Sequence, residues 1–304
     1  MIYLGRAKWR TMNRRSKTMN TNQYLTPEEI TEVTIQVGIK KTKASALNLF
    51  ILGILAGVFI AFASEGSNMA AFNLFAKSET YGLGKALAGA IFGTGLMLVV
   101  IAGGELFTGN TLILAGVLDK RISLKAMLRN WVIVYFGNLV GSLLIAYMMN
   151  QSGLFSSGAD MLGGVTIKIA AYKVGLEFMP AFYLGIMCNW LVCLAVWMAY
   201  GAKDMSGKIL AIFFPIWLFI TSGFEHSIAN MYYIPAGIFA KANPAMVAAA
   251  SQLGVTAEKL SHLNWSTFFI NNLIPVTLGN IVGGGLFVGG VYWFVYIKNN
   301  KKSA

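Results

Sequence analysis

The stretch Gly-Gly-Glu-Leu-Phe-Thr-Gly-Asn-Thr, residues 103–111, lies inside an apolar run that extends over residues 86–118. As one continuous helix this run would be about 50 Å long, whereas the hydrocarbon core of a bilayer is about 30 Å thick. The glycines weaken a helix in the middle of the run, and the acid is costly at that depth. We therefore expect the run to cross a membrane as two helical pieces with a break between them.

A second run of the same form extends over residues 209–240 and contains Thr-Ser-Gly-Phe-Glu-His-Ser-Ile-Ala-Asn at residues 221–230. It is also too long for one membrane-spanning helix and should break at its polar segment. Backbone that leaves the helical pattern at bilayer depth is tolerated only where protein buries it or where it lines a wet cavity. Both breaks are therefore predicted to face an internal pathway.

The composition of the whole chain is typical of a membrane protein. Of its 304 residues, 56% are hydrophobic and 12% are charged, whereas soluble domains carry about 25% charged residues. This excludes a soluble globular protein and predicts an all-α integral membrane protein that crosses the lipid bilayer several times. Six apolar spans are predicted, at residues 47–64, 86–118, 130–149, 180–202, 209–240 and 266–297.

The basic residues predict the orientation of these spans. With the N-terminus inside, 18 of the 24 Lys and Arg residues lie in cytoplasmic segments, as the positive-inside rule requires. Both termini are therefore predicted to be cytoplasmic, in a multi-pass protein of the cell membrane. The net charge of +12 then reflects topology, and we expect no nucleic-acid partner. The remaining basic residues are external: Lys77, Lys85, Lys168, Lys173, Lys241 and Lys259.

The two broken runs are the middle members of two three-span halves, whose orientations are opposite because three is odd. Such an inverted 3+3 repeat with paired interrupted helices indicates a substrate site between the halves. Glycine pairs at small-xxx-small spacing, such as Gly53/Gly57 and Gly279/Gly283, predict close helix packing. On the first, second and sixth spans we expect glycine-rich outer faces to contact neighbouring protomers.

The segments outside the spans divide the chain further. Residues 1–24 are predicted to be a disordered basic arm, in which Met19 is a second candidate start. Residues 25–45 are predicted to form a cytoplasmic amphipathic helix, because Thr26 and Glu29 have capping-box spacing and a proline follows Thr26. This helix is either a structural collar or a gating element. The other boundaries are 46–298 for the six-span channel domain and 299–304 for a cytoplasmic tail.

Three long motifs resemble those of the formate/nitrite transporter family, in the same order along the chain. They are Val-Ile-Ala-Gly-Gly-Glu-Leu-Phe-Thr-Gly at residues 100–109, Gly-Ile-Met-Cys-Asn-Trp-Leu-Val-Cys-Leu-Ala at 185–195 and Gly-Phe-Glu-His-Ser-Ile-Ala-Asn-Met-Tyr at 223–232. The resemblance implies an aquaporin-like six-helix protomer with one pore, assembled as a homopentamer. It also implies that small monovalent anions of weak acids, namely hydrosulfide, formate or nitrite, are the cargo. The overall character is most similar to the hydrosulfide channel branch.

The resemblance also implies roles for individual residues. Thr108 and His226 would line the substrate pathway, Asn189 would be a polar partner of the site, and Lys173 would lie at the external vestibule. Glu105 and Glu225 are expected to be structural at the breaks, because an uncompensated carboxylate would repel an anion. The hydrophobic constrictions would be formed by Phe92, Leu96, Leu106, Phe107 and Phe219.

Two mechanisms remain open for this pathway. In the first, Lys173 draws the anion inward and His226 supplies a proton, so that a neutral acid crosses the constrictions. In the second, the anion stays charged and His226 acts only as a hydrogen-bond donor. A proton-coupled secondary transporter of formate or nitrite is the alternative to a channel.

Other functional classes have little support. An intramembrane hydrolase needs a nucleophile, a base and an orienting group within reach, whereas no nucleophile motif accompanies Glu225 and His226, so we do not expect an enzyme. No cluster of His and Cys has ligand spacing, and we expect no metal and no cofactor. Cys188 and Cys193 would point away from each other on a helix, which argues against a disulfide. The tripeptide Asn-Pro-Ala at residues 243–245 occurs once and is interpreted as coincidence or a helix start.

Overall fold

The computed structural model describes residues 24–299. The predicted basic arm before Tyr24, the candidate start at Met19 and the predicted tail beyond Asn299 lie outside the described residues. Within the described part the chain is helical, apart from an isolated antiparallel bridge between Tyr24 and Ala202. Six helical stretches are long and apolar enough to cross a membrane: Ala46–Phe75, Ser78–Gly103, Leu124–Gln151, Phe178–Gly201, Met205–Ser222 and Trp265–Lys298.

The first span is longer than the sequence predicts. Helix α3 (Ala46–Phe75) continues past residue 64, although the following turns are polar. Glu65, Ser67 and Asn68 in these turns are buried, and Glu65 and Ser67 bond to groups on other helices. Ser67 Oγ, for example, donates to Ala63 O at 2.7 Å and to Ala88 O at 2.9 Å. A hydropathy pattern ends the span at Glu65, because it cannot register such bonds.

The second span is interrupted in the middle of the polar stretch. Helix α4 (Tyr81–Met97) continues as a π-helical turn to Gly103, and the chain then runs extended at Gly104 and Leu106. Gly103 has φ of +103°, a left-handed conformation that favours glycine. The chain then becomes helical again in three short segments. They are α5 (Phe107–Asn110), a 3₁₀ turn (Thr111–Ile113) and α6 (Leu114–Leu118).

The fifth span is interrupted in the same way. Helix α10 (Met205–Ser222) ends at Gly223, which has φ of +80°, and α11 (Ser227–Ala240) begins at Ser227. The two interruptions follow glycines that occupy the left-handed region, where a side chain would be strained. They fall at the two polar segments from which breaks were expected.

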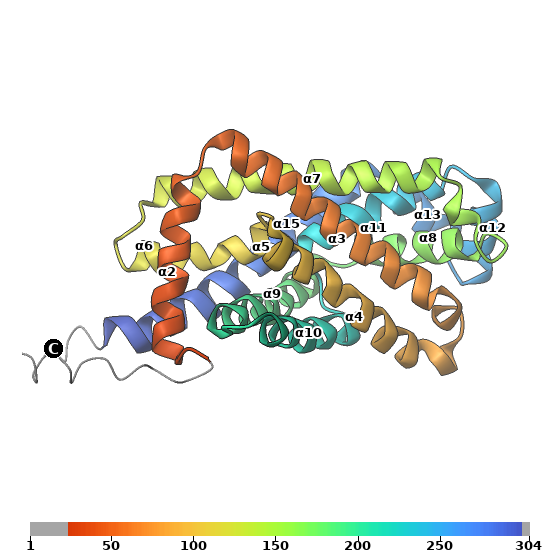
Figure 1. Ribbon diagram of the computed structural model, residues 1–304. Helices are drawn as coiled ribbons and strands as arrows, with labels where there is room; N and C mark the ends of the chain where they lie inside the picture. The colour runs from red at the N-terminus through yellow and green to blue at the C-terminus, as the bar shows by residue number, and fades with distance from the viewer. Residues whose placement is uncertain (1–23, 300–304) are drawn as a thin grey trace, which may run out of the picture.

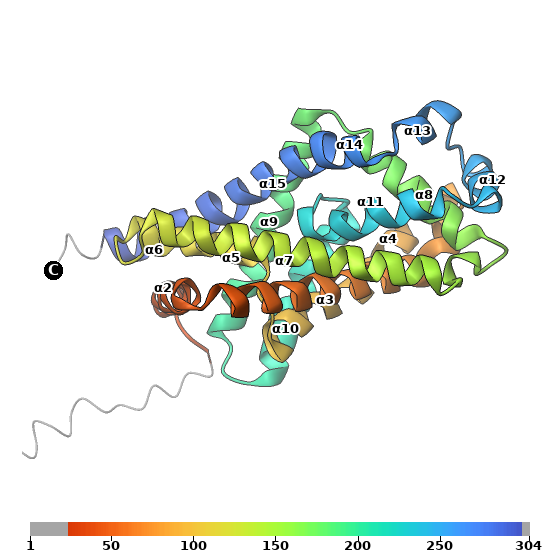
Figure 2. The same ribbon diagram turned by 90° about the horizontal axis from the view of Figure 1, so that it is seen from above.

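Short helices cover the two ends of the bundle (Figures 1 and 2). Helix α2 (Pro27–Lys43) crosses one end, and the predicted capping box between Thr26 and Glu29 is present. At the opposite end lie α8, α12 and α13. The Asn-Pro-Ala tripeptide, which was interpreted as coincidence or a helix start, is the start of α12. Asn243 Oδ1 caps that start by accepting from Ala245 N at 2.9 Å. Their bounds are Met161–Val174, Pro244–Gln252 and Ala257–His262.

The remaining helices form the body of the bundle. Helix α7 (Leu124–Gln151) packs along α3, and α9 (Phe178–Gly201) packs along the last span. That last span is irregular, and π-helical turns alternate in it with α-helix. Its parts are α14 (Trp265–Thr267), a π-helical turn (Phe268–Leu273), α15 (Ile274–Asn280) and further π-helical segments (Ile281–Gly290 and Trp293–Lys298).

Glycines bring these helix pairs into contact. A Cβ added at Gly141 of α7 would lie 2.1 Å from Ile54 O, and one added at Gly283 would lie 2.1 Å from Ile186 O. The predicted close helix packing is therefore present, but it lies inside the protomer. The expectation that glycines of the first, second and sixth spans are free to contact neighbouring protomers is wrong for Gly53, Gly57, Gly89, Gly93, Gly279 and Gly283, which all face atoms of this chain.

Replacing Gly141 with alanine should destabilise the protein by about 1–3 kcal/mol, because the new methyl group forces α3 and α7 apart. Thermal unfolding of the purified protein in detergent would show this as a lowered midpoint. Gly82→Ala is the matched control, since nothing lies within 4 Å of a Cβ at that position. An unchanged midpoint for Gly141→Ala would contradict the packing described here.

Candidate functional site

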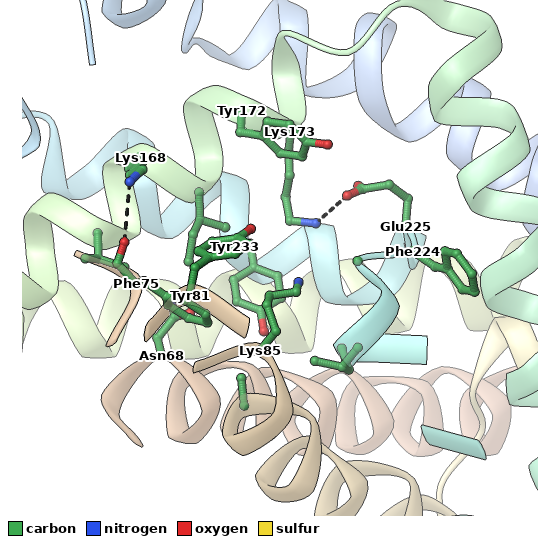
Figure 3. Close-up of a pocket in the computed structure, with 15 residues that line it drawn as sticks. Asn68, Phe75, Tyr81, Lys85, Lys168, Tyr172, Lys173, Phe224, Glu225 and Tyr233 are labelled. Carbon is green, nitrogen blue, oxygen red and sulfur yellow. Dashed lines mark hydrogen bonds and ion pairs between the residues drawn. The ribbon is translucent and has the colours of Figure 1, made fainter. Parts of the chain in front are cut away.

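Two cavities enter the bundle from opposite ends. The α2-side cavity, of about 290 Å³, is lined by residues that include Lys41, Leu96 and Glu105. The α8-side cavity, of about 220 Å³, is lined by residues that include Lys173 and Glu225 (Figure 3). Each cavity therefore reaches one of the two interruptions, which lie deep in the bundle.

Apolar side chains separate the two cavities. Phe92 and Phe219 meet edge to face, with ring centroids 5.6 Å apart, and the ring of Phe219 lies 6.1 Å from that of His226. Leu96, one helical turn after Phe92, lines the inner part of the α2-side cavity together with Leu106. All five side chains are buried. A solute that crosses between the cavities must pass this apolar layer.

Thr108 and His226 form a polar pair within that layer. Thr108 Oγ1 lies 2.8 Å from His226 Nε2, and both side chains are buried. His226 Nδ1 accepts a hydrogen bond from Ala229 N at 3.1 Å and so caps α11. In a neutral imidazole one ring nitrogen accepts while the other carries the hydrogen. The hydrogen of neutral His226 is therefore on Nε2 and is donated to Thr108 Oγ1, and the Thr108 hydroxyl can donate to a solute.

A charged network holds the interruption nearest α2. Lys41 Nζ lies 2.9 Å from Glu105 Oε2 and donates to Asn110 Oδ1 at 2.8 Å. Asn110 Nδ2 donates to Glu105 Oε2 at 2.7 Å and to Asn130 Oδ1 at 2.8 Å. Burial acts to lower the pKa of Lys41, but the neighbouring carboxylate of Glu105 outweighs it, and the pKa of Lys41 is raised.

A matching network holds the interruption nearest α8. Lys173 Nζ lies 2.8 Å from Glu225 Oε1, and the two side chains point toward each other in Figure 3. Asn230 Nδ2 donates to Glu225 Oε2 and to Asn272 Oδ1, each at 2.7 Å. One lysine, one glutamate and two asparagines thus recur at opposite ends of the bundle, as an inverted repeat requires.

Two further asparagines bind the backbone that the interruptions expose. Asn138 Oδ1 accepts from Phe107 N at 2.9 Å, and Asn138 Nδ2 donates to Gly53 O and to Glu105 O, each at 2.8 Å. Side chains of this kind replace the helical hydrogen bonds that the chain has lost. Asn280 makes the equivalent bonds, with Ser227 N at 2.9 Å, Gly185 O at 2.8 Å and Glu225 O at 3.0 Å.

Asn189 and Phe107, which were both expected at the site, line neither cavity and contact other parts of the chain. Asn189 Nδ2 donates to Thr108 O at 3.1 Å and to Asn280 O at 2.7 Å, so this side chain positions the backbone of Thr108. Phe107, expected in a constriction, packs its ring edge-on against Tyr135 with centroids 4.9 Å apart. The bond from Asn138 to the Phe107 backbone amide fixes that segment against α7.

Several residues of these networks were not predicted from the sequence. Lys41 and the four asparagines of the third and sixth spans were not singled out. A signal was present, because Asn130 and Asn138 recur at the same spacing as Asn272 and Asn280 in the corresponding spans of the two halves. Polar residues at equal spacing in corresponding spans would have identified them.

The sequence is similar to a family of transporters and to named formate channels. The profile of the family described as "Formate/nitrite transporter" matches residues 28–294. The "Formate channel FocA" of Escherichia coli (strain K12) is 39% identical over 290 residues, which cover 93% of this chain and 99% of that protein. The "Formate channel BtFdhC" of Bacillus thuringiensis is 40% identical over 277 residues, covering 90% of this chain and 97% of that protein.

Solved structures show the same fold. A structure described as "Pentameric formate channel with formate bound" has a TM-score of 0.71 and 41% identity, and the match covers 83% of this chain and 98% of that chain. A second, described as "FNT family ion channel", has a TM-score of 0.71 and 31% identity, and the match covers 88% of this chain and 98% of that chain.

Both ion pairs should contribute to stability. Lys41→Met leaves the Glu105 carboxylate buried without its cation, and removing one partner of such a pair costs about 3–5 kcal/mol. Lys41→Met combined with Glu105→Gln should recover much of the loss, and the Lys173 and Glu225 pair should behave alike in thermal unfolding. Lys125→Met, at an exposed position, is the control. Single variants as stable as the parent protein would rule out this account.

Proposed function

The chain belongs to the formate/nitrite transporter family, and from this membership we propose that it is a channel for small monovalent anions of weak acids, with formate as its main substrate. The observation that carries the proposal is the Thr108–His226 pair, which supplies polar hydrogens inside an apolar layer between two cavities. A hydrated divalent ion cannot pass such a layer without a large desolvation cost. The family is one of transporters and not of enzymes.

Formate is preferred over hydrosulfide because of the named relatives. Both sequence relatives described above are named formate channels and are about 40% identical over nearly their whole length. The similarity to the hydrosulfide branch rested on overall character and stays a prediction. Nitrite shares the bent shape and two acceptor oxygens of formate, so the same donors can bind it.

The arrangement of the central histidine favours a neutral hydrogen-bond donor. Conversion of His226 to imidazolium would place a hydrogen on Nδ1, which accepts from Ala229 N. The cap on α11 would then be lost, at a cost of about 1 kcal/mol, and the buried charge would add to that cost. We therefore favour the second mechanism, in which the anion stays charged and His226 is only a hydrogen-bond donor, over proton donation by His226. In this arrangement His226 donates to Thr108 Oγ1, and the Thr108 hydroxyl donates to the anion.

The orientation and the assembly are part of the same proposal. Basic residues concentrate on the α2 end, so that end is assigned to the cytoplasm and the α8-side cavity to the external face. A homopentamer is proposed because the similar formate channel is described as pentameric. The apolar residues on the outer face of α7, such as Leu128, Val132 and Phe136, are exposed in the single chain and are available for contact with lipid or a neighbour.

Uptake into proteoliposomes tests the proposed substrate class. We expect flux of formate and nitrite well above that of protein-free liposomes, and no flux of sulfate, because of its charge and size. Hydrosulfide and chloride complete the panel, and native mass spectrometry of the same preparation is expected to give a pentamer. Rapid sulfate flux, or hydrosulfide flux without formate flux, would overturn the proposal. A fixed ratio of protons to formate with uphill accumulation would identify a proton-coupled transporter.

His226→Asn tests the role of the central histidine. Asparagine is a strong N-cap and keeps a donor, so we expect formate flux within about tenfold of the parent protein, as expected for one weakened hydrogen bond. The pH profile and the ratio of protons to formate should not change. His262→Asn is the control, because it replaces the exposed histidine of α13. Loss of pH dependence in His226→Asn alone would instead establish His226 as the proton donor.

A further inference from the structure

The α8-side cavity contains more positive charge than its one recognised ion pair accounts for. Three lysines line it, namely Lys85, Lys168 and Lys173, together with the single acid Glu225 (Figure 3). The carboxylate of Glu225 is bound to Lys173 Nζ at 2.8 Å. The ammonium of Lys173 is therefore compensated, and it is a weak candidate for direct capture of an anion.

Lys85 is the lysine of this cavity that has neither an ion-pair partner nor a hydrogen-bond acceptor among residues 24–299. Lys168 Nζ donates to Phe75 O at 3.4 Å, whereas no hydrogen bond or ion pair joins Lys85 to another of residues 24–299. A Cβ added at Gly223 would lie 3.7 Å from Lys85 Nζ, so this ammonium lies beside the end of α10. It is half-buried and lines the cavity, where an anion must lose water.

A buried amide on the neighbouring helix also lacks a partner. Asn68 of α3 is 2% exposed and lines the same cavity, and its Nδ2 has no hydrogen-bond acceptor within the described chain. Leaving such a donor unsatisfied is costly, so its presence indicates a ligand or water. Glu65, one helical turn earlier, is not a cavity-lining residue, and its Oε2 accepts from the Tyr232 hydroxyl.

We propose that Lys85 and Asn68, which line the same cavity, form an anion-binding subsite in the α8-side cavity, for a small anion with two acceptor oxygens such as a carboxylate or nitrite. This inference rests on the proposed function and names the groups that select the anion before it reaches Thr108 and His226. The lysine ammonium binds one oxygen with a charge-assisted bond, and the asparagine amide donates to the other. A halide or hydrosulfide has a single acceptor atom and gains less from the second donor.

Formate uptake and formate binding measure this subsite separately. For Lys85→Gln we expect the half-saturating formate concentration to rise at least about tenfold, as for loss of a hydrogen bond to a charged group, with the maximal flux largely retained. Lys85→Arg should restore most of the affinity.

Asn68→Leu, of similar size, should raise the half-saturating concentration for formate and leave inhibition by chloride unchanged. Lys168→Gln is the matched control, because it removes a second cavity lysine that already has an acceptor.

Calorimetric titration of formate into the detergent-solubilised pentamer separates failure of this inference from failure of the proposed function. If the parent protein carries no formate but formate binding weakens in Lys85→Gln and not in Lys168→Gln, the subsite stands and the proposed substrate is wrong. If formate is carried and both variants bind it as the parent does, the subsite is overturned. Equal weakening in the two variants, or equal loss of chloride and formate affinity in Asn68→Leu, also overturns it. Should Asn68→Leu fail to assemble, the comparison of Lys85→Gln with Lys85→Arg decides the question.

Discussion

Each peptide N–H and C=O that leaves the helical pattern inside a bilayer must find a partner within the protein. In this chain two asparagines help to meet that requirement, because each binds one amide and one carbonyl of an interruption and one carbonyl of a neighbouring helix. The residue that follows each buried glutamate is thereby held at the start of the next helix. This residue is Leu106 in one half and His226 in the other. The polar pair in the apolar layer is therefore a result of how the backbone is held.

The scaffold is duplicated but its chemistry is not. The ion pair between lysine and glutamate and the bond from an asparagine to that glutamate recur in both halves. At the position after the glutamate, however, one half has an aliphatic side chain and the other an imidazole. An imidazole can cap the new helix and still donate through its second nitrogen, which a leucine cannot do. The result is one hydrogen-bonded pair between apolar neighbours, which can donate to an anion that has lost water.

Much of this could be predicted from local sequence. The glycines and acids inside overlong apolar runs predicted where the helices end, and the motif around His226 predicted the central pair. The partner of Glu105 could not be found in this way, because Lys41 lies 64 residues away and on a helix that was interpreted as a surface element. The end of the first span was misplaced at Glu65 for a related reason, since bonds to distant helices decide whether a polar side chain is buried. The direction in which a side chain points could not be predicted either. Phe107, for example, points toward α7 and packs against Tyr135.

The order of the ion-pair partners along the chain has a consequence for biogenesis. Lys41 precedes Glu105 and Lys173 precedes Glu225, so the ribosome synthesises each cation before its carboxylate. Each acid can therefore meet its counter-charge as soon as its own segment leaves the translocon, and a buried uncompensated carboxylate need not persist while the rest of the chain is translated. The helices α2 and α8, which carry Lys41 and Lys173, are therefore synthesised before the carboxylates that they neutralise, although neither helix is long enough to cross the bilayer.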